Sequence, residues 1–163
     1  MERRFLVRSR DWPAPRRTLH IRQAYLNQRD ELSVRVRNIE NDYWLTLKAG
    51  VRSGVRHEFE WPIPAEDGRV MIERLASAPP ITKIRHEVED AGRLWEVDVF
   101  DGANAGLLIA ETELHDLHEP LALPAWLGPE VTGDPRLSNN ALYRHPFTAW
   151  GISYDQLLAE AAA

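Results

Sequence analysis

The sequence predicts a mainly β protein with a few helices, in which about eight strands form an antiparallel sheet, a sandwich or a barrel. Short runs rich in Val, Ile, Leu, Trp or Phe alternate between apolar and polar side chains with period two. Turn-forming residues separate these runs, as at Asn41-Asp42, Asp90-Ala91-Gly92 and Asp101-Gly102. Helical periodicity is confined to three short segments.

Eight segments have the strand-like alternation. They are Arg4–Val7, Leu19–Leu26, Leu32–Arg37, Trp44–Lys48, Val55–Trp61, Ile81–Val88, Leu94–Phe100 and Leu107–Leu114. Most are joined by short turns, which favours hairpins and therefore antiparallel neighbours. The proline-rich stretch Pro120–Pro129 is predicted to be a surface loop.

The first helical segment is Ala65–Ser77, which follows Pro64. Val70, Ile72 and Leu75 occupy helix-compatible positions in it, and we expect this helix to cross one end of the sheet. The other two predicted helices are Leu137–Leu142 and the Ala- and Leu-rich C-terminal segment Tyr154–Ala163.

The composition narrows the classes of function. A chain of 163 residues fits one domain, 1–163, with its own core. The net charge of -5 argues against a nucleic-acid partner bound through bulk positive charge. The absence of cysteine excludes disulfides and thiol chemistry. No apolar run of about 18 residues and no signal-peptide pattern occur, so we expect a cytoplasmic protein without a membrane partner.

Within the predicted strands, charged side chains of one sign recur two residues apart, so that both members of a pair share a face. Arg56 continues the register of Glu58, while Lys48 and Asp98 occupy single alternating positions. The same-sign pairs are Arg35 with Arg37, Glu58 with Glu60, Lys83 with Arg85, and Glu111 with Glu113.

Two arrangements account for these pairs. In a half-solvated sheet the charged face points to water, where salt screens the charges and nothing favours pairs of one sign. On an enclosed face, pairs of one sign are costly unless a ligand neutralises them. Cation pairs then suit a polyanion such as a phosphate chain, and carboxylate pairs suit Mg²⁺ or Mn²⁺. The set as a whole favours a site for a metal and a polyphosphate.

A series of motifs in fixed order carries a family resemblance. It opens with Glu2-Arg3-Arg4-Phe5-Leu6-Val7 and covers roughly residues 1–145. The later motifs are Gln23–Leu26, Val34–Arg37, Leu45–Lys48, Arg56–Glu60, Thr82–Arg85, Trp95–Phe100, Ala110–Leu114 and Glu130–Asp134, then Asn139 and Leu142. In this order they resemble the CYTH family, also called the triphosphate tunnel metalloenzymes.

The resemblance implies a closed, eight-stranded antiparallel β-barrel whose charged interior binds a triphosphate with Mg²⁺ or Mn²⁺. It implies a metal-dependent triphosphate hydrolase, acting on inorganic tripolyphosphate in the first reading. The alternatives are an adenylate cyclase, a thiamine or nucleoside triphosphatase, and a polyphosphate-binding module without turnover.

The resemblance also implies roles for individual residues. Substrate-binding residues would be Arg35, Arg37, Lys48, Arg56, Lys83, Arg85 and Arg136. Metal-binding residues would be Glu2, Glu58, Glu60, Asp98, Glu111 and Glu113, with Asp98 also bracing the cations. Catalytic residues would be Glu2, Arg4 and Lys48.

Two departures from the family's Glu-x-Glu-x-Lys signature accompany this resemblance. The first signature glutamate falls one position before Met1, and Arg4 replaces the signature lysine. Loss of a carboxylate predicts weaker metal binding, and the Lys-to-Arg change keeps the charge with a different geometry. The oligomeric state and the preferred metal are left open.

Overall fold

The structure is a computed structural model that describes residues 2–29, 31–50, 56–115 and 119–163; the side chain of Arg56 lies outside this description, as does Val55 of the predicted fifth strand. Its nine strands are β1 (Glu2–Val7), β2 (Arg17–Arg29), β3 (Leu32–Ile39), β4 (Asp42–Gly50), β5 (Arg56–Ile63), β6 (Ile81–Asp90), β7 (Arg93–Phe100), β8 (Leu108–Glu113) and β9 (Leu127–Glu130). The mainly β prediction is confirmed.

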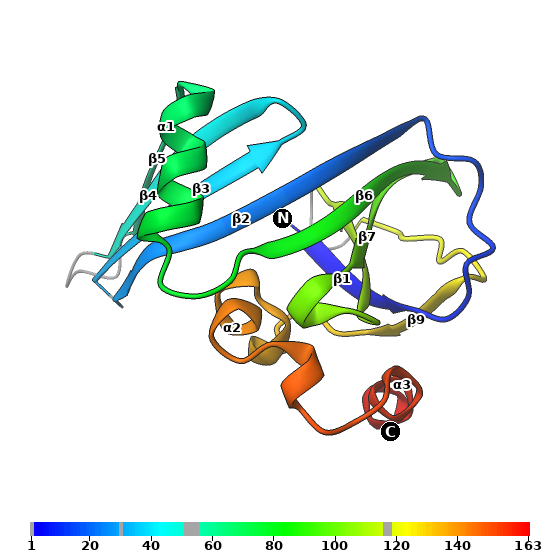
Figure 1. The fold of residues 1–163 in the computed structure, drawn as a ribbon. Coiled ribbons are helices and arrows are strands. Elements are labelled where there is room, and N and C mark those ends of the chain that lie inside the picture. Colours follow the sequence, from blue (N-terminus) through cyan, green and yellow to red (C-terminus); the bar gives the residue numbers. More distant parts are fainter. Residues whose placement is uncertain (1, 30, 51–55, 116–118) are drawn as a thin grey trace.

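All nine strands form one antiparallel sheet in the order β5-β4-β3-β2-β6-β7-β8-β1-β9. The long strand β2 runs through the middle of the molecule, with β3 to β5 on one side and β6, β7, β1 and β9 on the other (Figure 1). The prediction of eight strands is therefore corrected to nine. Within the described residues, hydrogen bonds do not join the edge strands β5 and β9, so the closed barrel is not confirmed.

The ninth strand comes from the proline-rich stretch that the sequence predicts to be a loop. In β9, Leu127 lies opposite Val7 and Glu130 lies opposite Phe5 of β1. The alternation does not reveal this strand because it is short and contains Gly128 and Pro129. Proline lacks a backbone N–H, but a strand at the edge of a sheet needs no hydrogen-bond donor on its unpaired side, so β9 can contain Pro129.

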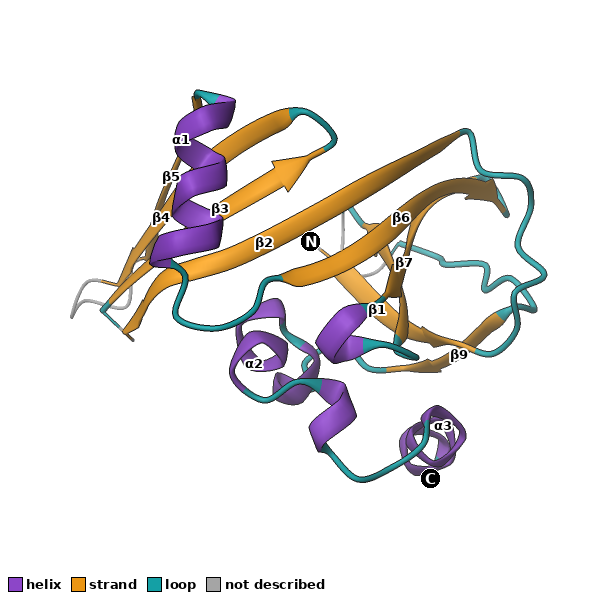
Figure 2. Ribbon diagram, in the orientation of Figure 1, coloured by secondary structure: helices purple, strands orange, loops and turns teal. Residues whose placement is uncertain are grey.

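The helices are short and lie outside the sheet (Figure 2). Ser138 caps α2 by accepting a hydrogen bond from the Ala141 N–H, and Ser153 forms a capping box with Gln156 at α3. The helices are α1 (Ala65–Val70), which continues as a π-helical turn (Met71–Leu75), α2 (Asn139–Arg144) and α3 (Tyr154–Ala162), with single 3₁₀ turns at Gly102–Asn104, Pro135–Leu137 and Phe147–Ala149. No helix in the described part of the chain is long and apolar enough to cross a membrane.

Helix α1 packs on the outer face of the sheet over β3 and β4, not across one end as the sequence suggests (Figure 1). Of the three apolar residues that the sequence places in helix-compatible positions here, only Ile72 is buried, whereas Val70 and Leu75 are exposed. Gly68 makes the close approach possible, because a Cβ there would lie 2.3–2.7 Å from atoms of the Tyr43 side chain.

Strands β6, β7, β8, β1 and β9 form the half of the sheet on one side of β2. On the face of this half that carries the predicted charged residues, side chains change from charged to apolar along β1 and β6. On β1, Arg4 is followed two residues later by Leu6, and on β6, Lys83 is preceded by Ile81. The apolar residues pack with side chains from residues 137–157 in one core cluster. Helix α3 is held in place by the Tyr154 hydroxyl, which accepts a hydrogen bond from the Val7 N–H at 2.8 Å. The packed apolar end leaves the charged end of the same face available for a ligand.

Candidate functional site

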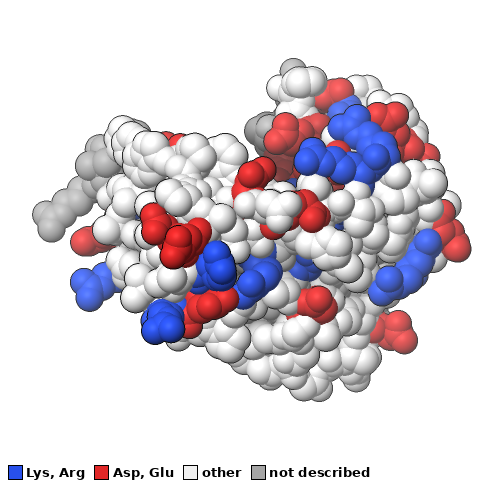
Figure 3. Space-filling view, turned by 45° about the horizontal axis from the view of Figure 1, so that its top comes forward, with Lys and Arg blue, Asp and Glu red and all other residues white. Residues whose placement is uncertain are grey.

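The strand registers place the predicted charged residues on one face of the sheet. Arg85 lies opposite Asp98, and Glu111 lies opposite both Glu96 and Arg4. Residues that lie opposite each other in a ladder share a face, and so do residues two apart in a strand. Basic and acidic side chains are intermixed over the visible surface, without one large patch of a single sign (Figure 3). The same-sign pairs are therefore neutralised in part by opposite charges on neighbouring strands.

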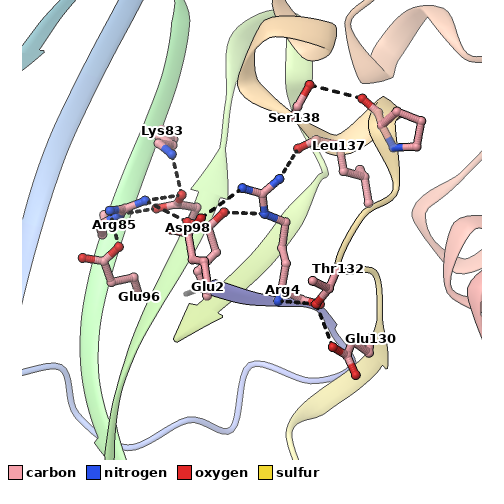
Figure 4. A network of polar contacts seen from close by, with 12 residues as sticks. Glu2, Arg4, Lys83, Arg85, Glu96, Asp98, Glu130, Thr132, Leu137 and Ser138 are labelled. Carbon is pink, nitrogen blue, oxygen red and sulfur yellow. Dashed lines mark hydrogen bonds and ion pairs between the residues drawn. The ribbon is translucent and has the colours of Figure 1, made fainter. Parts of the chain in front are cut away.

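A buried ion-pair network forms the centre of the second half of this face. Lys83 of β6 is 5% exposed and Asp98 of β7 is 1% exposed, and their Nζ and Oδ2 atoms lie 2.5 Å apart. Arg85 donates two hydrogen bonds to the same carboxylate, from Nε at 2.7 Å and from Nη2 at 2.8 Å. One carboxylate thus fixes both cations, and Figure 4 shows Lys83 and Arg85 converging on Asp98.

Carboxylates of β7, β8 and β1 extend the network toward the charged end. Arg85 also pairs with Glu96. On the other side, the Nε of Arg4 lies 2.6 Å from Glu111, and its Nη2 lies 3.6 Å from Glu2 (Figure 4). The Arg4 Nη1 donates to the Leu137 carbonyl at 3.3 Å, which ties the strand to the turn before α2.

The pKa shifts show how strongly burial acts here. Burial alone would raise the pKa of Asp98, but the charge of Lys83 and the hydrogen bonds from Arg85 outweigh it and lower that pKa. Burial lowers the pKa of Lys83 in spite of Asp98. Burial raises the pKa of Glu111 and of Glu96, although nearby cations oppose the shift. An additional positive charge nearby would stabilise the ionised form of both carboxyl groups.

A second group of charges lies on β3, β4 and β5. Glu60 accepts a hydrogen bond from the Thr46 hydroxyl at 2.6 Å and lies 3.5 Å from Arg35 and 3.4 Å from Arg37. Lys48 pairs with Glu58 at 3.3 Å. Burial, followed by the charge of Arg35, lowers the pKa of Arg37, and the charge of Arg85 contributes to the same shift. The strand order places β2 between the two groups.

Three buried donors on this face have no hydrogen-bond partner among the residues that the structure describes. They are the Nε atoms of Arg35 and Arg37 on β3 and the amide nitrogen of Gln23 on β2. Because a buried donor without a partner loses about 1–3 kcal/mol, such groups call for an acceptor. An anion with several oxygens would supply acceptors to all three.

An acidic cavity of about 540 Å³ opens beside the network of Lys83, Asp98 and Arg85, at the charged ends of β1, β7 and β8. Carboxylates from β1, β7 and β8 line it, together with Glu119, Arg93 and His115. The lining carboxylates are those of Glu2, Glu96, Glu111, Glu113 and Glu119. Within the described residues, no three acidic or histidine side chains are grouped closely enough to hold a metal ion by themselves. Mg²⁺ beside a phosphate commonly takes only one or two carboxylates, so these oxygen donors still suit it.

The structure brings most of the predicted site residues to one face but divides them into two groups. Glu58 and Glu60 lie with Lys48, Arg35 and Arg37, whereas the other predicted metal ligands lie with Lys83, Arg85 and Arg4. Both oxygens of Asp98 are already bound by cations, which fits a bracing role.

Arg136 is not brought together with the others. Its guanidinium group pairs with Asp134 at 2.8 Å and lies over the ring of Trp150. It lines a separate cavity of about 450 Å³ that also involves Glu160 of α3. The structure therefore does not group Arg136 with the charged site, and its role at the mouth stays a prediction; Arg56 is untested because its side chain lies outside the described part.

Sequence reasoning assigned no role to Glu96, Thr46 or Gln23. Glu96 stands two residues before Asp98 in its strand, so the period-two pattern that revealed the other acidic pairs contains this signal as well. Thr46 and Gln23 are neutral, and a search for charges passes over them. Only their burial in the structure draws attention to them, since Thr46 is 1% exposed and Gln23 is 2% exposed.

Known proteins are similar to this chain in sequence and in fold, although no protein-family model matches it. The inorganic triphosphatase of Acetivibrio thermocellus is 38% identical over 148 residues, which cover 90% of this chain and 94% of that protein. The inorganic triphosphatase of Nitrosomonas europaea is 34% identical over 156 residues, covering 87% of this chain and 95% of that protein. The crystal structure of the inorganic triphosphatase NE1496 superposes with a TM-score of 0.72 at 30% identity, covering 88% of this chain and 96% of that one.

The fold and the site define the class first. An antiparallel sheet that buries cations and unpaired donors on one face has the features of an anion-binding protein. The chain belongs to the CYTH, or triphosphate tunnel, family, and its relatives in that family are inorganic triphosphatases. The family resemblance of the sequence is thereby confirmed.

Proposed function

We propose that this protein is a metal-dependent inorganic triphosphatase that binds tripolyphosphate along the charged face, around which the sheet curves as a tunnel. The observation that carries the proposal is the pair of partly buried cation groups on one face, with donors that lack partners among the described residues. Relatives named inorganic triphosphatase, similar over most of the chain, support the substrate class.

The cations would bind the phosphate oxygens, and the carboxylates would hold the cations in place. Arg35 and Arg37 offer unpaired Nε donors, and an arriving phosphate would compete with Glu60 for the rest of both guanidinium groups. On the other side, Asp98 holds Lys83 and Arg85 ready before substrate arrives. Hydrolysis of a phosphoanhydride needs mainly positioning and neutralisation of negative charge, and this face provides both.

The acidic cavity would hold Mg²⁺ or Mn²⁺ beside the phosphate chain. Glu2, Glu111 and Glu113 are its candidate ligands, because all three line the cavity and carboxylate oxygens suit hard cations. A bound divalent ion would polarise phosphoryl oxygens or lower the pKa of a bound water. The raised pKa of Glu111 supports the choice, because a cation there would stabilise its charged form.

Phosphate release from tripolyphosphate with Mg²⁺ or Mn²⁺ tests this function, against ATP, thiamine triphosphate and pyrophosphate as competing substrates. Tripolyphosphate should give the highest kcat/KM. Arg37→Ala should lower tripolyphosphate affinity at least about tenfold, because a charge-assisted hydrogen bond contributes about 1.5–3 kcal/mol. Arg22→Ala is the matched control, because Arg22 lies on the opposite face of β2 from Gln23 and should leave affinity unchanged.

Each other outcome has a definite meaning. Calorimetric binding without phosphate release at any metal concentration would identify a polyphosphate-binding module. Faster turnover of ATP or thiamine triphosphate would change the substrate. Equal affinity of the unsubstituted protein and Arg37→Ala would refute the site on β3.

A further inference from the structure

Gln23 occupies the centre of the charged face without carrying a charge. It lies in the middle of β2, where it is opposite Arg37 of β3 on one side and Ile81 of β6 on the other. Its side chain is 2% exposed, and its amide nitrogen is buried with no hydrogen-bond partner in the described part of the chain. The donor therefore lacks an acceptor, which a ligand bound on this face would supply.

The strand that carries Gln23, β2, lies between the two cation groups. Arg35 and Arg37 lie on β3, and Lys83 and Arg85 lie on β6, with β2 between these strands. Neighbouring strands are about 4.8 Å apart, so β3 and β6 are separated by roughly 10 Å. An anion that contacts both groups at once must pass over β2. A shorter anion can be bound by one group alone.

We propose that Gln23 is a substrate-contacting residue that donates a hydrogen bond to the phosphate chain where the chain crosses β2, and so favours tripolyphosphate over shorter phosphates. This inference rests on the proposed function. The neutral amide satisfies an oxygen between the cation groups without adding another buried positive charge. The two neighbouring unpaired donors, the Nε atoms of Arg35 and Arg37, lie on the adjoining strand.

A purely structural role predicts a different response to substitution. A glutamine that holds the fold together uses its amide in bonds to the protein, as Gln28 does when its Nε2 donates to Asn140 Oδ1 at 3.0 Å. Gln23→Met removes the donor and keeps the volume close to that of glutamine. Because the Gln23 amide nitrogen has no protein partner, its loss should not lower the stability of the ligand-free protein.

The experiment measures two quantities on the full chain in EDTA: calorimetric Kd values for tripolyphosphate and pyrophosphate, and the ligand-free melting temperature. Gln23→Met should weaken tripolyphosphate binding by on the order of tenfold and pyrophosphate binding by less than about threefold. Its melting temperature should equal or exceed that of the unsubstituted protein. Gln28→Met should show the reverse, with a lower melting temperature and a tripolyphosphate Kd within about twofold.

The results separate the two proposals. If the unsubstituted protein binds tripolyphosphate and Gln23→Met binds it equally well, the role of Gln23 is wrong while the proposed function stands. An equal loss of affinity for both phosphates would overturn the discrimination by chain length. A drop in the ligand-free melting temperature of Gln23→Met would assign Gln23 to the fold. If the unsubstituted protein binds no tripolyphosphate in EDTA, the role of Gln23 is wrong; if it also releases no phosphate from tripolyphosphate with Mg²⁺ or Mn²⁺, the proposed function fails as well.

Discussion

Asp98 is the single side chain on which the buried cations of β6 depend most. Its carboxylate neutralises Lys83 and Arg85, and all three are largely removed from water. A buried pair adds little net stability compared with apolar residues, but removal of one partner leaves an uncompensated charge. Here one substitution would leave two cations without their shared anion, because no other carboxylate among the described residues lies within ion-pair distance of Lys83.

Asp98→Asn should therefore lower the free energy of unfolding at pH 7 by about 3–5 kcal/mol, measured by urea denaturation. The folded-state pKa of Asp98 is depressed, so its contribution is present above the unfolded pKa of about 3.9 and is lost as pH falls through the lower folded value. The difference between the two proteins should be constant from about pH 8 to pH 5 and should shrink below about pH 4.

The exposed residue Asp42 provides the control for that series. Asp42→Asn should change the free energy of unfolding by no more than about 0.5 kcal/mol at any of these pH values. A similar loss in both variants, or a difference for Asp98→Asn that grows as the pH falls, would show that Asp98 does not stabilise the buried cations.

At the scale of elements, helix propensity and tertiary packing favour different residues at position 68 of α1. Glycine inside a helix is less favourable than alanine by about 1 kcal/mol, so Gly68→Ala should strengthen the isolated helix. In the folded protein, the added Cβ would lie 2.3 Å from the nearest Tyr43 atom, a distance that real Cβ contacts do not reach. Overpacking of this kind costs about 1–3 kcal/mol, so packing should outweigh propensity.

Gly68→Ala should thus lower the free energy of unfolding by about 1–2 kcal/mol in urea denaturation, and speed hydrogen exchange in α1. Val70→Ala is the comparison within the same helix, because Val70 is exposed and should tolerate alanine with little change. A gain of stability in Gly68→Ala would mean that α1 does not pack against Tyr43 as closely as described.

At the scale of the whole molecule, the charged face joins two halves of one open sheet. β3, β4 and β5 form one side of β2, and β6, β7, β8, β1 and β9 form the other. In the described residues, no hydrogen bonds join the edge strands β5 and β9. A ligand bound by both cation groups would connect the two halves of the sheet through its charge instead. Substrate binding would then stabilise the sheet as a unit.

Hydrogen exchange with and without tripolyphosphate tests this connection. At about 100 times its Kd, the ligand should add about 2.7 kcal/mol to stability and raise the melting temperature by about 5–10 °C. Amide exchange should slow in both β3 and β6, whereas inorganic phosphate should protect at most one of these strands. Protection confined to one strand with tripolyphosphate would contradict binding across β2.

The sequence by itself determined the antiparallel β class, the positions of eight strands and the C-terminal helix. It also determined which strand residues share a face, because period-two alternation is a local property of the backbone. The charged face was therefore visible in pairs such as Lys83 with Arg85 and Glu111 with Glu113 before any fold was known.

Only the tertiary structure decided which charges neutralise one another and which donors are left over. Asp98 meets Lys83, and Glu60 meets Arg35, through strand registers that involve residues far apart in the chain. Tertiary packing also turned Arg136 away from the charged face, made part of a proline-rich stretch into an edge strand and buried Gln23 without a partner. The physical reason is the same in each case: pairing register and burial depend on contacts across the sheet, which local sequence patterns do not specify.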